Sequence, residues 1–193
     1  MHTAFQFDRY YLRRQVLALT GKIRLYAPDG HQVLFCHQKM FRLKEDIRAY
    51  SDETCTQELL FIQARSVIDF SAAYDVIDSG FGNKVGVLRR KGWRSLMRDE
   101  WEVLTAEDQP IGLLWEDNPQ RALIRRLLAG RLLPQDYDLL IDGKRVADLR
   151  QRFNLFRYEM DLDFSIDTDH LLDHRLGIAA AILLAVVEGR QDS

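Results

Sequence analysis

The sequence predicts a mainly β fold, an antiparallel closed barrel of about twelve strands around a buried hydrophobic C-terminal helix. Between about positions 10 and 164, short apolar runs alternate with Gly, Asp and Pro, which is typical of strands joined by turns. Residues 156–164 alternate apolar and polar side chains with period two. Residues 176–187 carry no polar side chain, which indicates a helix buried on every side.

The size and composition indicate one soluble domain over residues 1–193. A chain of 193 residues is long enough for one core and short for two. Its 47% hydrophobic and 29% charged content excludes disorder and a membrane-embedded body. The formal net charge of −2 provides no global attraction to nucleic acid, so a polyanion would have to meet a local basic patch.

The N-terminal segment and the cysteines predict a cytoplasmic protein. The first fifteen residues contain no apolar stretch of signal-peptide length. Cys36 and Cys55 do not form a CxxC pair, and we expect both to be reduced thiols buried on strands.

The strands can be placed from the period-two pattern and the turn residues. We expect them to begin near Tyr10, Lys22, His31, Leu43, Gln57, Ala72, Lys84, Trp101, Ile111, Tyr137, Lys144 and Phe156. In the last strand, Phe156 and the apolar residues at alternate positions after it would face the core. Asp29-Gly30 and Asp142-Gly143 each predict a two-residue hairpin in which both residues have positive φ.

An internal repeat supports this segmentation. Gly30, Gly82 and Gly143 are each followed three places later by valine. Nine places after the same glycines stand Lys39, Lys91 and Arg152. A repeated unit of turn, strand and basic residue predicts related hairpins around the barrel.

Two segments carry helical signals. Asn118-Pro119 and Gly130 bound a short amphipathic helix between the ninth and tenth strands, with arginines on its polar side. The run at 176–187 is shorter than the roughly twenty apolar residues that span a bilayer, so we expect it inside the barrel. Asp167, Thr168 and Asp169 would cap this helix.

The sequence resembles the LURP-one-related family, which shares the tubby C-terminal-like fold with tubby proteins and phospholipid scramblases. The resemblance lies in KIRLYAPDGHQVLFCHQKMFRLKEDIRAY (22–50), in KVGVLRRKGWRSLMRDEWEV (84–103) and in the closing apolar helix, and it covers roughly 10–187. It implies a barrel filled by the C-terminal helix and no established catalytic site. In the related groups it implies phosphoinositide binding by tubby domains and calcium-dependent action of scramblases at membranes. The chain lacks segments that resemble the cysteine-rich and proline-rich regions of scramblases, which argues against lipid transport.

An acidic stretch before the final helix offers a weak metal site. Its oxygen and nitrogen donors are Asp161, Asp163, Asp167, Asp169, His170 and His174. An EF-hand loop starting at Asp161 would need glycine and glutamate where the chain has Ile166 and Leu172. His170 and His174 would share a helix face, but no third ligand can be named. The alternative interpretation assigns these residues to the outer face of a strand, helix capping and the mouth of the barrel.

The strongest functional signal is a local excess of cations. Arg89, Arg90, Lys91, Arg94 and Arg98 occur without an acidic residue between them, and Arg121, Arg125 and Arg126 lie on the expected short helix. We therefore predict a non-enzymatic binding module without a cofactor that attaches from the cytoplasm to anionic, phosphoinositide-type membrane surfaces. A protein–protein interaction scaffold is the alternative, with a calcium- or zinc-dependent hydrolase or a scramblase-like protein next. The remaining interpretation is that the patch binds nothing and that its arginines form ion pairs with Asp and Glu on neighbouring strands.

Overall fold

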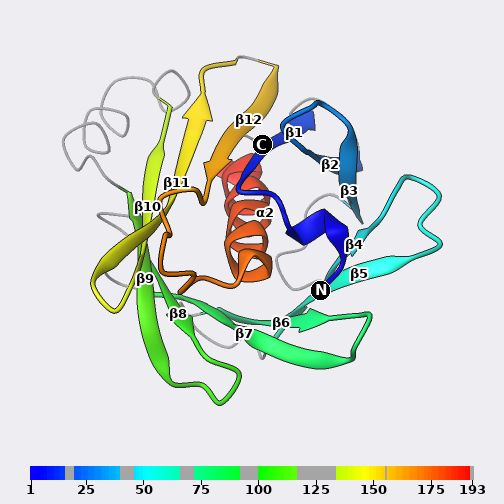
Figure 1. The fold of residues 1–193 in the computed structure, drawn as a ribbon. Helices are drawn as coiled ribbons and strands as arrows, with labels where there is room; N and C mark the ends of the chain where they lie inside the picture. The colour runs from blue at the N-terminus through cyan, green and yellow to red at the C-terminus, as the bar shows by residue number, and fades with distance from the viewer. Residues whose placement is uncertain are drawn as a thin grey trace.

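The computed structural model describes residues 1–15, 20–39, 46–65, 72–91, 100–116, 134–154 and 156–191. Figure 1 shows the arrangement of its elements. In chain order these are η1 (Thr3–Phe5), β1 (Arg9–Gln15), β2 (Thr20–Tyr26), β3 (Gln32–Lys39), β4 (Ile47–Tyr50), β5 (Glu58–Ala64), β6 (Ala73–Asp78), β7 (Asn83–Arg90), β8 (Glu100–Leu104), β9 (Pro110–Glu116), β10 (Asp136–Ile141), β11 (Lys144–Arg152), β12 (Arg157–Asp163) and α2 (His174–Gln191).

The strands form a closed antiparallel barrel in which neighbours in sequence are neighbours in space. β1 pairs with β2 on one side and with β12 on the other, from Arg9 opposite Asp163 to Gln15 opposite Arg157. This last pairing closes the sheet, so neither terminal strand is left with an open edge. The predicted mainly β class, with a closed barrel of twelve strands and a C-terminal helix, is confirmed.

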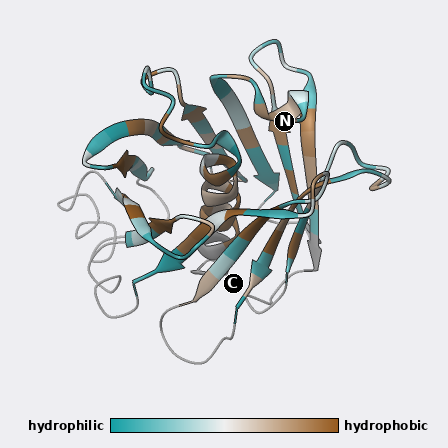
Figure 2. Cartoon of the chain, turned by 60° about the horizontal axis from the view of Figure 1, so that its bottom comes forward, coloured by the Kyte–Doolittle hydropathy of each residue, from teal (hydrophilic) through white to brown (hydrophobic). Residues whose placement is uncertain are grey.

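Alternation of buried and outward side chains explains why the strands lie where the pattern placed them. The largest offset between a predicted and an observed strand start is four residues, from Leu43 to Ile47. Figure 2 shows the matching alternation of apolar and polar bands along the strands. The prediction for Phe156 was wrong: β12 begins one residue later, and the Phe156 ring is 65% exposed.

Two hairpins with the same Asp-Gly dipeptide turn in different ways. Asp142 and Gly143 have φ values of 48° and 76°, as a two-residue hairpin requires. In the other turn Gly30 is left-handed with φ 87°, but Asp29 is not. The Gly30 N–H donates to the Ala27 carbonyl, so this turn is longer than predicted and only its glycine has the left-handed conformation.

The repeated glycines mark three hairpins spaced four strands apart around the barrel. Gly30, Gly82 and Gly143 all have positive φ and lie in the β2–β3, β6–β7 and β10–β11 turns. We call this end of the barrel the hairpin end. The strands that follow these turns run to the opposite end, where β3 finishes at Lys39, β7 at Arg90 and β11 at Arg152. We call that opposite end, at which all odd-numbered strands finish, the basal rim.

The helix α2 begins earlier than the apolar run and has a different cap from the predicted one. Asp173 precedes it, and its carboxylate accepts a hydrogen bond of 3.0 Å from the Arg175 N–H. Asp167 instead accepts from the N–H groups of Leu171 and Leu172 in the preceding turns. The capping prediction for Asp167 and Asp169 was therefore wrong, because the chain makes further turns before the helix starts.

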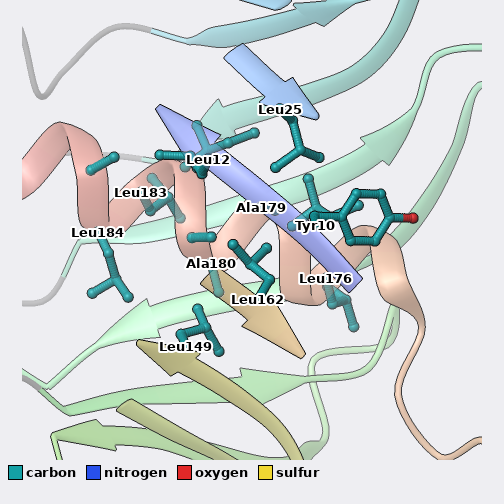
Figure 3. Packing of buried hydrophobic residues seen from close by; sticks show 14 of the residues in the cluster. Tyr10, Leu12, Leu25, Leu149, Leu162, Leu176, Ala179, Ala180, Leu183 and Leu184 are labelled. Atoms are coloured by element: carbon teal, nitrogen blue, oxygen red, sulfur yellow. The ribbon is translucent and has the colours of Figure 1, made fainter. Parts of the chain in front are cut away.

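Side chains on every face of α2 are buried. Leu176 and each residue from 178 to 186 expose 6% or less of their surface. The helix contacts β6, β7 and β12. Figure 3 shows Leu12 and Leu25 on one side of it and Leu149 and Leu162 on another. Burial on all sides explains why residues 176–186 contain no polar side chain.

The two cysteines differ in environment. Cys36 lies fully buried on β3, and this burial raises the pKa of its thiol. Cys55 is exposed in the turn between β4 and β5, where it has a φ of 57°, so its predicted burial was wrong. The short helix predicted at 118–130 lies outside the described residues.

Gly112 on β9 provides a test of the close packing between β9 and β10. A Cβ at this position would lie 2.7 Å from Cδ1 of Ile141 and would overlap the backbone carbonyl oxygen of Leu140. We expect Gly112→Ala to lower the free energy of unfolding by about 1–3 kcal/mol, because the two strands must move apart. Chemical denaturation measures this change.

Gly30→Ala is the matched control for Gly112→Ala. A Cβ at Gly30 meets no atom within 4 Å, so this variant carries only the cost of a left-handed alanine. A Gly112→Ala variant as stable as the wild type would contradict the packing described for β9 and β10.

Candidate functional site

The described cations of the predicted basic patch lie where β7 reaches the basal rim, beside two glutamates of β8. Arg89 forms an ion pair of 2.6 Å with Glu102 on the neighbouring strand β8. Lys91 forms one of 2.7 Å with Glu100, and this hydrogen bond raises the pKa of the lysine. Burial alone would raise the pKa of Glu102, but the hydrogen bond and charge of Arg89 hold it below its usual value. Arg89 and Lys91 therefore agree with the alternative interpretation from the sequence, in which the cations pair with acidic residues on neighbouring strands.

The other predicted cations cannot be placed. Arg94, Arg98, Arg121, Arg125 and Arg126 lie outside the described residues. The segments that contain them join β7 to β8 and β9 to β10. In an antiparallel barrel both connections start from the basal rim, as the connection between β11 and β12 does.

Two exposed aromatic residues stand at the same rim. Phe153 and Phe156 flank the connection between β11 and β12 and expose 56% and 65% of their surfaces. Exposed apolar side chains that gather on one surface often mark an interaction site. Among the helices in the described part of the chain, none is long and apolar enough to cross a membrane.

The carboxylates of the predicted metal site all have partners within the protein. Asp161 receives two hydrogen bonds from Arg152, of 2.6 and 2.7 Å. Asp163 pairs with Arg9 at 3.0 Å, and Asp169 pairs with Lys144 at 2.7 Å. As described above, Asp167 holds backbone N–H groups in the turns before α2.

The two histidines occupy different kinds of position. His170 has a φ of 51° in the turn before α2, and His174 is the first residue of the helix. The His174 ring packs on Phe164 with its centroid 4.7 Å away. Within the ranges that the structure describes, no group of three or more His, Cys, Asp or Glu residues is placed to hold a metal ion.

A groove of about 550 Å³ lies on the outer wall of the barrel, over β1 and the turn between β2 and β3. We call it the wall groove. Its volume falls in the range of small-molecule sites. It is lined by Arg9, Tyr10, Tyr11, Arg13, Tyr26, Ala27, Pro28, Gly30, Arg152 and Asp161. Three guanidinium groups and one carboxylate therefore line a single concave surface.

Register explains why these side chains meet. Tyr11 and Arg13 lie two apart on β1 and both point outward. Tyr26 pairs directly with Tyr11 across β1 and β2, and their ring centroids are 6.1 Å apart. Arg152 reaches the same place from β11, where its guanidinium lies 4.8 Å from the centroid of the Tyr11 ring.

The guanidinium groups of the groove are held by rings and carboxylates. Arg13 lies 5.5 Å from the centroid of Tyr11 and 5.9 Å from that of Tyr26, and its Nε is 3.3 Å from a Glu159 oxygen. A hydrogen bond with Tyr11 raises the pKa of Arg13, and one with Asp161 raises the pKa of Arg152. Burial would raise the pKa of Glu159, but hydrogen bonds from Tyr11 and Asn154 keep it low. Arg13 and Arg152 are thus held in place by rings and carboxylates and stay charged.

Sequence reasoning missed both the wall groove and the exposed aromatic residues. Phe153 and Phe156 carried a signal, since two phenylalanines within a turn between polar residues are unusual in a soluble protein. For the groove the only local signal was the outward Tyr11 and Arg13 on β1. Its other members come from distant parts of the chain and needed the register.

Comparison with known proteins gives one match. A family model described as LURP-one-related matches residues 32–185, most of the chain. A search of curated proteins found no match, and neither did a search of solved structures.

Proposed function

Starting from the LURP-one-related family, to which this chain belongs, we propose that the protein is a non-enzymatic binding module. Its proposed partner is an anionic, phosphoinositide-type membrane surface, which it meets from the cytoplasm through the basal rim. The observation that carries this proposal is the position of Phe153 and Phe156 at the rim where the cationic end of β7 also lies.

Charge and apolar surface at one rim favour attachment to a membrane over binding of a small anion. Each Lys or Arg near an anionic bilayer contributes roughly 1 kcal/mol, and several act together. An exposed aromatic ring adds to this when it enters the interface, by up to about 1.5–3 kcal/mol for full burial. Neither contribution is sufficient alone, so attachment would be reversible and sensitive to salt.

The ion pairs of Arg89 and Lys91 make the proposed attachment dependent on the rest of the rim. Both cations already face glutamates on β8, so lipid phosphates must compete with Glu100 and Glu102. Arg94 and the arginines at 121, 125 and 126 belong to connections that start at this rim, and the proposal assigns them the remaining attraction.

The proposal treats residues 1–193 as one domain with α2 as the core of the barrel. All-round burial of α2 and its contacts with β6, β7 and β12 support this position. A rigid core would hold the basal rim in a fixed shape while its side chains meet a partner.

Liposome flotation tests the proposal with two variants. One changes Arg89, Arg90, Lys91 and Arg94 to Ser, and the other changes Phe153 and Phe156 to Ser. Each is expected to keep its melting temperature within a few degrees and to lose most binding to phosphoinositide-containing vesicles at low salt. Wild-type binding is expected to fall as salt is added and to be absent with neutral lipid.

Controls come from the hairpin end of the barrel. Phe81 is 73% exposed in the β6–β7 turn, and Lys144 is exposed in the β10–β11 hairpin. Phe81→Ser and Lys144→Ser should bind vesicles as the wild type does. Equal binding by the rim variants, or no wild-type binding at any salt concentration, would refute membrane attachment and leave a protein partner as the next candidate.

A further inference from the structure

We propose that the wall groove is a second binding site, made by other residues than the proposed membrane attachment, and that its ligand is a small soluble molecule carrying a phosphate group. The proposal rests on three guanidinium groups that line one concave surface, two of which, those of Arg13 and Arg152, already contact the Tyr11 ring. The groove variants change other residues than the rim variants, so pyrophosphate titration and vesicle flotation distinguish a failure of this proposal from a failure of the proposed membrane attachment.

The arrangement of donors fits a tetrahedral oxyanion. Arg9 and Arg13 come from β1 and Arg152 from β11, so N–H groups reach the groove from two strands that are not neighbours. A guanidinium has five N–H donors in a planar fork that matches phosphate oxygens. Asp161 engages Nε and Nη2 of Arg152, so further donors of this group remain for a ligand.

Charge in the groove favours an anion. Three arginines line it and Asp161 is its one lining carboxylate. Glu159 and Asp163 hold Arg13 and Arg9 from β12 without lining the groove. These two carboxylates lower the attraction for an anion, but their ion pairs also hold the guanidinium groups of Arg9 and Arg13 beside the groove.

The tyrosines reduce the cost of ordering the arginines. The guanidinium groups of Arg13 and Arg152 both lie within 6 Å of the centroid of the Tyr11 ring, which is cation–π distance. Long arginine side chains normally lose rotamer freedom when they bind a ligand. The ring contacts already restrict Arg13 and Arg152, so phosphate binding costs less side-chain entropy and the free energy of binding is more favourable.

The position of the groove argues for a soluble ligand over a lipid headgroup. The groove runs along the outer wall from Arg152, the last residue of β11, to the β2–β3 turn at the hairpin end, where Ala27, Pro28 and Gly30 line it. A membrane that meets the basal rim would lie across the other end of the barrel. The part of the groove toward the hairpin end would then remain open to water when the protein is attached.

Titration of the purified full chain with inorganic pyrophosphate, followed by calorimetry at low salt, tests the assignment. We expect saturable binding by the wild type. Arg13→Gln and Arg152→Gln should each weaken it about tenfold or more, since each removes charge-assisted hydrogen bonds. Asp161→Asn should bind more tightly than the wild type, because it removes the carboxylate that competes for Arg152.

Arg48 and Glu58 supply matched controls elsewhere on the outer wall. Arg48 pairs with Glu58 at 2.6 Å and lies 4.1 Å from the centroid of the Phe61 ring, as Arg152 does with Asp161 and Tyr11. Arg48→Gln and Glu58→Gln should bind pyrophosphate with wild-type affinity. Thermal melting of every variant verifies that the fold is retained.

Three outcomes would overturn the proposal. The first is absence of saturable wild-type binding, and the second is equal weakening by Arg48→Gln and Arg152→Gln. The third is loss of phosphoinositide vesicle binding in Arg13→Gln and Arg152→Gln without any pyrophosphate binding by the wild type, which would assign the groove to a lipid headgroup. Weaker binding by Asp161→Asn would overturn the competition between Asp161 and the ligand for Arg152.

Discussion

Ala181→Asp is expected to leave the protein unfolded or insoluble. Ala181 lies in the middle of α2 and is fully buried, with apolar residues before and after it. An aspartate there must bury its carboxyl group without a partner, at a cost of several kcal/mol. That cost is comparable with the total stability of a domain, about 5–15 kcal/mol. The yield of soluble protein and the thermal melting curve measure the effect.

Leu171→Asp is the control for a new carboxylate in the same part of the chain. Leu171 is 38% exposed in the turns before α2, so its replacement can stay in water. We expect this variant to remain soluble with a melting temperature close to that of the wild type. A soluble Ala181→Asp variant with an unchanged melting temperature would contradict the proposal that α2 is the core of the barrel.

Arg175→Met is expected to destabilise the protein by about 3–5 kcal/mol. The Arg175 guanidinium joins the start of α2 to the end of β6, because it contacts Asp173 at 2.9 Å and also forms an ion pair with Asp78. The Asp78 side chain is only 5% exposed. Without the Arg175 guanidinium, the buried Asp78 carboxylate would keep only two hydrogen-bond donors among the described residues, the backbone N–H groups of Gly80 and Phe81. Urea denaturation measures the loss.

The effect of Arg175→Met should depend on pH in a defined direction. Burial alone would raise the pKa of Asp173, but hydrogen bonds from the Arg175 side chain and N–H hold it below the usual value. A lowered pKa stabilises the folded state above the unfolded pKa of about 3.9, and this stabilisation is lost as the pH falls through the folded pKa. The difference in the free energy of unfolding between the wild type and Arg175→Met should therefore become smaller as the pH falls. A difference in the free energy of unfolding that grows as the pH falls would contradict the coupling between Arg175 and Asp173.

Arg48→Met separates the buried ion pair from an ordinary surface pair. Arg48 and Glu58 are 47% and 25% exposed in their side chains, so solvent screens their attraction. We expect this variant to lose no more than about 1 kcal/mol. Equal destabilisation by Arg48→Met and Arg175→Met would mean that burial of the Asp78 carboxylate has no energetic consequence.

The proposed membrane site was partly predictable from the sequence. The cations from Arg89 onward form a local excess that composition alone reveals. That Arg89, Arg90 and Lys91 end at the same rim as Phe153 and Phe156 became visible only with the topology, because alternate connections of an antiparallel barrel share one end. The pairing of Arg89 with Glu102 also depends on which strand lies beside β7.

Local patterns in the sequence predicted where the strands and the apolar helix lie along the chain and which turn glycines have positive φ. Alternation with period two, glycines with positive φ and the uninterrupted run at 176–187 are local properties that only a few backbone conformations satisfy. The closure of β1 against β12 and the wall groove were decided by tertiary structure. Tyr11 and Arg152 are far apart in the chain, and their contact requires β12 to pair in register with both β1 and β11. Ion pairs have the same origin, because any arginine can pair with any carboxylate until barrel closure selects its neighbours.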